Sequence, residues 1–151
     1  MKTIGEAIYQ KQFPNNQVKA DINIVYTASW LTVDKTRVLR PHKISVQQFN
    51  ILRILRGLHP QVASLRYLAE RMIDQTSNAS RLVDKLFLNG LVDRKECPND
   101  RRQVEITITE KGLVVVEEAS NDIQKNLKNF ANVTDEELEL LNDILDKIRN
   151  Q

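Results

Sequence analysis

The sequence predicts a mainly α-helical fold with one small β-hairpin, in a single domain of 151 residues. Apolar residues recur at three- and four-residue intervals over most of the chain, which is the period of amphipathic helices. The period changes once, at residues 104–109, where Val104, Ile106 and Ile108 alternate with polar residues as in a strand. The length suits one continuous core, because single domains usually contain roughly 100 to 200 residues.

Two helices are predicted in the first part of the chain. Residues 24–38 carry an apolar stripe that ends before Pro41, a residue that usually follows a helix end. The members of this stripe are Ile24, Ala28, Leu31 and Val38. Ser45 and Gln48 have the spacing of a capping box and predict a second helix over residues 46–56.

Two shorter helices, joined by a tight turn, are predicted over residues 64–72 and 75–89. The first begins near Ser64 and has Leu65, Leu68, Ala69 and Met72 on one face. Asp74 is the expected N-cap of the second helix, and Gly90 is its expected C-terminal stop. The apolar face of the second helix consists of Ala79, Leu82, Val83 and Leu86.

A hairpin and two C-terminal helices complete the predicted fold. Residues 91–96 can pair with the strand at 104–109 through the turn formers Pro98, Asn99 and Asp100. Thr109 can cap a long helix, and Thr134 with Glu137 forms a capping box before the last helix. The apolar stripes of these helices are Val116, Ala119, Ile123, Leu127 and Phe130, then Leu138, Leu141, Leu145 and Ile148. Striped terminal helices at about 18–40 and 110–150 thus flank a compact core at about 45–112.

The order of elements between Ser64 and Thr109 is that of a helix-turn-helix followed by a β wing. With the apolar face of residues 75–89 turned inward, the opposite face carries polar and basic side chains suited to base edges in a major groove. These residues are Gln75, Thr76, Ser77, Asn78, Ser80, Arg81 and Lys85. The same residue types are common as helix caps and solvent-facing residues, so this face alone leaves the function open.

The predicted hairpin tip carries Asp100, Arg101 and Arg102. Arginine fits the narrow, negative minor groove, and a neighbouring carboxylate can hold its planar guanidinium in one orientation. An exposed turn with a weak surface ion pair is the alternative interpretation. Further candidates for contact with the DNA backbone are Arg53, Arg66, Arg94 and Lys95.

The net charge of +2 is small but unevenly distributed. Residues 35–69 hold seven bases and no acid, whereas residues 113–151 hold four bases and nine acids. The basic middle can attract a polyanion, and the acidic tail should face away from it. A solvated charged surface would give the same count.

The sequence offers little for catalysis, metal binding or membrane insertion. Cys97 is the single cysteine, and with His42 and His59 it makes no structural zinc site. No glycine-rich phosphate loop occurs, and neither histidine has a nucleophile or carboxylate in motif spacing, so we expect neither an enzyme nor a cofactor. The sequence lacks a secretory-signal pattern and any stretch near the ~20 apolar residues that span a bilayer, which favours the cytosol.

Residues 45–112 resemble the MarR family of bacterial transcription regulators. The resemblance is carried by VQQFNIL at residues 46–52, LRYLA at 65–69, SRLVDKL at 80–86, NGLVDR at 89–94, DRR at 100–102 and ITEKG at 108–112. It implies that the wing signature of the family falls on Asp100 and Arg102, with Arg102 in the minor groove and Asp100 orienting it. The resemblance further implies a protein of the bacterial cytosol, associated with the nucleoid.

The same resemblance implies a homodimer in which the first and last helices of two copies interlock. Such a dimer would bind a palindromic operator with half-site centres about 10 bp apart and repress a promoter. Many members of the family respond to small aromatic or lipophilic ligands, and the residues that are candidates to line a pocket are Tyr26, Trp30, His42 and Phe49, although aromatic residues at helical spacing more often belong to the core. Cys97 lies in the wing rather than in the first helix, which argues against redox sensing. The alternative function is a winged-helix protein-interaction module or an antirepressor without DNA binding.

Overall fold

A computed structural model describes residues 2–97 and 100–150, and the side chains of residues 96–103 are outside the description. The described chain is mainly helical, with three short strands. The elements in chain order are α1 (Ile4–Ala7), α2 (Asn16–Leu39), the 3-10 turn η1 (Arg40–His42), α3 (Val46–Leu58), β1 (Ala63–Ser64), α4 (Leu65–Arg71), α5 (Ala79–Leu88), β2 (Val92–Cys97), β3 (Asp100–Ile108), α6 (Glu110–Lys125), the 3-10 turn η2 (Leu127–Phe130) and α7 (Asp135–Arg149).

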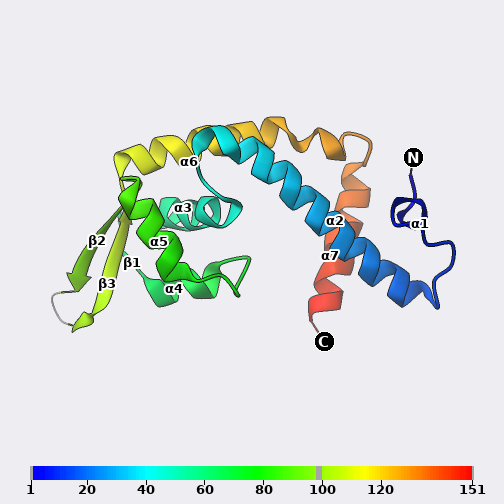
Figure 1. Ribbon diagram of the computed structural model, residues 1–151, viewed down its shortest axis with the longest axis horizontal. Coiled ribbons are helices and arrows are strands. Elements are labelled where there is room, and N and C mark those ends of the chain that lie inside the picture. The colour runs from blue at the N-terminus through cyan, green and yellow to red at the C-terminus, as the bar shows by residue number, and fades with distance from the viewer. Residues whose placement is uncertain (1, 98–99, 151) are drawn as a thin grey trace.

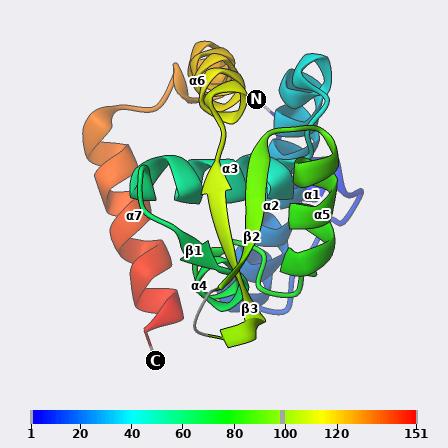
Figure 2. The ribbon, with the colours of Figure 1, turned by 90° about the vertical axis from the view of Figure 1, so that its left-hand side faces the viewer.

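The elements divide into a compact head and two extended arms (Figure 1). The head contains α3, α4, α5 and the sheet, while α2 and α7 lie together at the other end of the molecule. Helix α6 crosses above the head and continues toward α7, as the view from the side also shows (Figure 2). This arrangement confirms the predicted mainly α fold with a small hairpin between long terminal helices.

The sheet consists of the predicted hairpin and one additional strand. Strands β2 and β3 are antiparallel, with Val92 opposite Ile108, and β1 pairs with the other edge of β3 through Ala63 and Ile106. Strand β1 was not predicted, because its two residues are too few to show a period. The predicted tip residues Pro98 and Asn99 lie outside the described residues.

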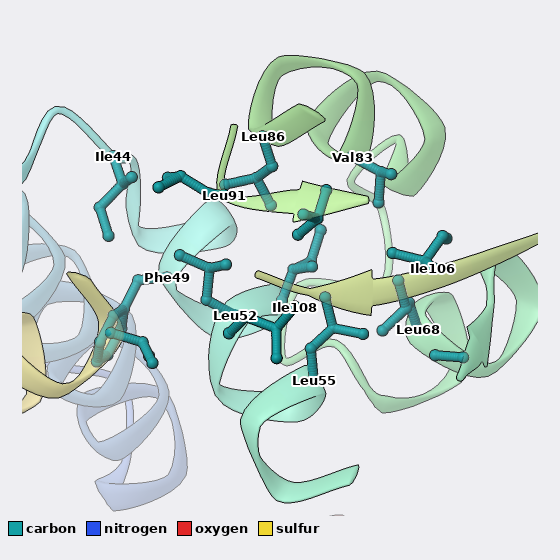
Figure 3. Close-up of a cluster of buried hydrophobic side chains, with 14 of the residues drawn as sticks. Ile44, Phe49, Leu52, Leu55, Leu68, Val83, Leu86, Leu91, Ile106 and Ile108 are labelled. Atoms are coloured by element: carbon teal, nitrogen blue, oxygen red, sulfur yellow. The ribbon is translucent and has the colours of Figure 1, made fainter. Parts of the chain in front are cut away.

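The core of the head forms where α3, α4, α5 and the hairpin meet (Figure 3). The side chains of Leu52, Leu68, Val83, Leu86 and Ile106 are fully buried there, which confirms the predicted inward face of α5. Full burial of one such side chain contributes about 1.5–3 kcal/mol. The head therefore fixes which side of α5 faces outward.

Local signals set most helix ends as predicted. Capping boxes occur at Ser45 with Gln48 and at Thr134 with Glu137, and the Thr109 hydroxyl accepts from the Gly112 backbone N–H at 3.0 Å. Gly90 ends α5 with a φ of +69°, a conformation that glycine adopts without steric cost. 

The long terminal helices agree with the predicted ranges at the N-terminal side and differ at the C-terminal side. Helix α2, Asn16–Leu39, matches the predicted helix at about 18–40 and starts before the apolar stripe, where the Asn15 side chain caps it by accepting from the Val18 backbone N–H at 2.9 Å. The predicted continuous helix from Thr109 to Phe130 is interrupted, since α6 ends at Lys125. The last two members of its stripe lie in η2 instead.

Candidate nucleic-acid interface

The helix that carries the predicted base-contacting residues starts later than predicted. The prediction of residues 75–89 with Asp74 as N-cap is wrong, because α5 begins at Ala79 and its cap is Asn78. The Asn78 side-chain oxygen accepts from the Arg81 backbone N–H at 3.0 Å. Asp74 bonds instead within the preceding turn, and such local bonds of Asp compete with helix formation.

Asp74 organises the turn between α4 and α5. Its Oδ1 accepts from the Thr76 backbone N–H at 3.1 Å and from the Thr76 hydroxyl at 2.6 Å, and its Oδ2 accepts from the Ser77 hydroxyl at 2.7 Å. The hydroxyls of Thr76 and Ser77 lower the pKa of Asp74 from 3.8 to about 2. The turn is also tied to α3, because the Asn50 side chain accepts from the Ile73 backbone N–H at 2.9 Å.

The predicted major-groove residues form one surface over the turn and the start of α5. Of these residues, Ser77 is half-buried, and the others are exposed: Gln75, Thr76, Asn78, Ser80, Arg81 and Lys85. The first four, residues 75–78, belong to the turn rather than to the helix. In Figure 1 the start of α5 lies on the same lower side of the head as the far end of the hairpin.

The hairpin is held to α5 by an ion pair that the sequence analysis did not anticipate. Arg94 of β2 bonds to Asp84 of α5, so this candidate for a DNA-backbone contact is engaged within the chain. Lys95 beside it is exposed. Backbone pairing places Asp100 opposite Cys97 at the start of β3, whereas the side chains of Asp100, Arg101 and Arg102 lie outside the described residues.

The basic block at residues 35–69 is partly neutralised by acids from outside it. Arg56 pairs with Glu117 of α6 at 2.7 Å, and Arg66 pairs with Glu70 at 2.8 Å. Arg37 pairs with Asp34 in the same way. Of the two remaining backbone-contact candidates, Arg66 is therefore paired and Arg53 is exposed.

The four candidate pocket residues are not gathered around one cavity. Tyr26 and Trp30 lie on α2 with 44% and 48% of their surface exposed, so both offer aromatic surface to solvent. His42 bonds through Nε2 to Asp122 of α6 at 3.0 Å, and Phe49 is buried in the core. The cavities described for this chain are lined by other residues.

A largely apolar groove of about 480 Å³ separates α2 from α7. Its apolar lining comes from Ile24, Ala28 and Leu31 of α2, Phe130 of η2, and Leu138, Leu141 and Leu145 of α7. No residue of α7, from Asp135 to Arg149, is buried in the single chain. The arms therefore expose both halves of an apolar surface.

Residues 2–97 and 100–150 contain neither a cluster of metal-binding side chains nor a helix able to cross a membrane. Within these ranges, no three or more His, Cys, Asp or Glu side chains are grouped to hold a metal ion. The helices described there are too short or too polar to cross a membrane.

Comparison with known proteins gives one consistent result. The profile of the MarR family matches residues 44–104. A putative MarR-like transcription regulator from Bacillus cereus is 25% identical, with a TM-score of 0.79 over 89% of this chain and 96% of that one. An organohalide-sensing transcriptional regulator, solved with 2,4-dichlorophenol bound, is 24% identical with a TM-score of 0.81 over 93% of this chain and 86% of that one.

A third similar structure is that of the PcaV transcriptional regulator from Streptomyces coelicolor in complex with its natural ligand. It is 22% identical to this chain, with a TM-score of 0.66 over 82% of this chain and 89% of that one. The three alignments extend well beyond residues 44–104, so the likeness includes helices on both sides of the head.

Proposed function

We propose that this chain is a transcription regulator of the MarR family, whose profile matches residues 44–104, and that it binds double-stranded DNA sequence-specifically, as a homodimer, and represses transcription from a palindromic operator. The observation that carries the proposal is the outward surface of the turn and α5. This surface is polar and exposed, while the opposite face of α5 is buried in the core. A recognition helix requires this division of faces.

The dimensions of α5 suit a major groove. Its 10 residues make a helix about 15 Å long, and the groove of B-DNA is about 12 Å wide. Val83 and Leu86 are fully buried, so the helix cannot rotate its polar face away from the groove without losing core contacts. Ser80, Arg81 and Lys85 then face the bases or phosphates.

The homodimer is proposed from the unfilled apolar surface of the arms. Exposed apolar patches of this extent on a soluble chain usually mark an interaction surface. A second copy presents the same two helices, and a twofold axis would bring α2 and α7 of both copies together. Two heads held this way would contact half-sites about 10 bp apart.

A small aromatic or lipophilic effector is part of the same proposal. Two of the similar structures are regulators solved with a bound ligand, one of them 2,4-dichlorophenol. Of the four candidate pocket residues, Tyr26 and Trp30 have exposed aromatic surface with which to meet such a ligand, whereas Phe49 is already buried in the core. Trp30 is the only tryptophan, so its fluorescence should respond when 2,4-dichlorophenol is titrated as a probe.

The proposal is tested by fluorescence-anisotropy titration with the DNA upstream of the protein's own gene, at two salt concentrations and with excess nonspecific competitor. We expect competitor-resistant binding that weakens steeply as salt rises, since phosphate contacts release counterions. A library of genomic fragments extends the test to operators elsewhere. Absence of duplex binding at both salt concentrations would favour the protein-interaction module instead.

Arg102→Ala is the variant that tests the wing. Loss of an arginine contact in a groove should cost about 1–3 kcal/mol of operator affinity while the fold and the dimer persist. Arg149→Ala is the matched control, because this arginine lies in α7 and pairs with Asp146. Equal affinities for the wild type and Arg102→Ala would remove Arg102 from the interface.

A further inference from the structure

The Thr76 and Ser77 hydroxyls, in the turn between α4 and α5, both donate their hydrogen bonds to the Asp74 carboxylate. A hydroxyl has one proton to donate and two lone pairs that accept. Thr76 donates its proton to Asp74 Oδ1 at 2.6 Å, and Ser77 donates its proton to Oδ2 at 2.7 Å. Toward any other partner, each hydroxyl can therefore act only as a hydrogen-bond acceptor, through its lone pairs.

The donor and acceptor in these two hydrogen bonds cannot exchange roles. The pKa of Asp74 is about 2, so the carboxyl is ionised at neutral pH and has no proton to return. Hydrogen bonds to an ionised acceptor are roughly twice as strong as those between neutral groups. A neutral acceptor on a DNA base therefore cannot compete with Asp74 for either proton.

We propose that Asp74 is a positioning residue that determines base specificity, by presenting the Thr76 and Ser77 hydroxyls to DNA as hydrogen-bond acceptors only. The inference rests on the proposed DNA binding. Thr76 is exposed two residues before the cap of α5, Asn78, in the region where recognition helices contact base edges. In the major groove the complementary donors are the exocyclic amino groups of adenine and cytosine.

The same carboxylate places a negative charge on the surface that faces DNA. It repels phosphates irrespective of base sequence, so it weakens nonspecific binding. Asp74 thus raises the ratio of operator affinity to nonspecific affinity in two ways, through hydroxyl orientation and through charge. The two contributions can be separated by substitution.

Asp74→Asn is the decisive variant, because it alters the two hydroxyls differently. The Thr76 backbone N–H bonds to Oδ1 at 3.1 Å, so the amide oxygen of the new side chain must stay on that side. The amide NH₂ then faces Ser77 and donates to it, which turns the Ser77 proton outward. Ser77 becomes a donor, while Thr76 stays an acceptor.

The experiment measures affinities for the operator and for all single-base variants of it. We expect Asp74→Asn to bind nonspecific duplex more tightly and to lose about three- to tenfold of preference at one or two adjacent base pairs, as for one neutral hydrogen bond. Asp93→Asn is the charge-matched control, because Asp93 is an exposed acid of β2 in the same head. It should tighten nonspecific binding without changing the base profile.

A double-substitution background distinguishes positioning from a structural role. In Thr76→Val with Ser77→Ala, Asp74 has no hydroxyl to orient, so adding Asp74→Asn should change the base profile no further. The background variant itself should lose preference at the same base pairs, which keeps the test informative if Asp74→Asn folds poorly.

Two results would overturn the inference. The first is that Asp74→Asn and Asp93→Asn have identical base profiles, and the second is that Asp74→Asn changes the base profile further in the double-substitution background. Failure of the wild type to bind any duplex would instead refute the proposed function, and the role of Asp74 would fall with it.

Discussion

Leu141 lies in the groove between α2 and α7, and replacing it with glutamate is expected to dissociate the proposed dimer. The Leu141 side chain is 44% exposed in the single chain and faces the groove together with Ile24 of α2. If the arms interlock as proposed, a second copy buries the exposed part of the Leu141 side chain.

The expected magnitude follows from that exposed fraction. Complete burial of a leucine is worth about 1.5–3 kcal/mol, so the exposed 44% leaves about 0.7–1.3 kcal/mol to be gained per copy. A twofold dimer contains the residue twice, which gives about 1.3–2.6 kcal/mol. Loss of this term alone weakens the dimer about ten- to hundredfold. The desolvation of two glutamates adds several kcal/mol, so Leu141→Glu should be monomeric at micromolar concentration.

The assay is sedimentation at several concentrations, paired with a thermal melt and with the operator titration. Leu88→Glu is the control, because Leu88 is 82% exposed at the end of α5, and α5 belongs to the head and not to the arms (Figure 1). We expect the control to sediment as the wild type does. A dimeric Leu141→Glu with an unchanged melting curve would show that the α7 stripe faces solvent, and the argument for the dimer would fail.

Three further predictions concern the head. Gly112→Ala should destabilise the fold by about 1–3 kcal/mol or more, since a Cβ there would lie 2.1 Å from the Leu91 carbonyl oxygen; an unchanged melting temperature would contradict this. Asn78→Ala removes the N-cap of α5 and should lower the free energy of unfolding, measured with urea, by about 1 kcal/mol. Asn89→Ala is the control, because Asn89 follows the end of α5 and its side chain caps no helix start. Because the pKa of Asp74 falls from 3.8 to about 2 on folding, its stabilisation is present above about pH 4 and is lost as the pH falls toward 2. Stability curves between these pH values should therefore be flatter for Asp74→Asn than for the wild type, and parallel curves would refute the assignment.

Helix ends were predictable where one local contact decides them. The capping pairs at Ser45 and Thr134 each span three residues, so the sequence contains everything that the contact needs. Gly90 is similar, because the positive φ is a property of that residue alone. The alternation at residues 104–109 was equally informative, since one side of β3 faces the core.

The start of α5 was not predictable from capping rules. Asp74 and Asn78 are both favourable N-cap residues, and each precedes polar residues that a helix tolerates. The choice between them depends on the Thr76 and Ser77 hydroxyls, which bond to Asp74 and leave Asn78 to cap. A capping rule scores each candidate separately and cannot register this competition.

The distribution of charge in space was also hidden from the sequence. Arg56 meets Glu117 from 61 residues away, and Arg94 meets Asp84 across the joint between α5 and the hairpin. Counting bases over residues 35–69 overstated the free positive charge for this reason. The surface proposed to face DNA depends on which lysines and arginines lack an acidic neighbour after folding.

The first part of α6 packs into the core of the head, whereas the elements after α6 do not. Val116 and Ala119 of α6 are fully buried in the same core as Leu52 of α3, so the first part of α6 moves with the head. His42 of η1 bonds to Asp122 of α6, one turn beyond Ala119, which ties the turn after α2 to the same helix. After α6 ends at Lys125 the chain forms the 3-10 turn η2, and no residue of η2 or α7 is buried. In the proposed dimer, we therefore expect a ligand that shifts α2 relative to α7 to act on the head through α6, and to change the spacing of the two heads on DNA without any rearrangement inside the head.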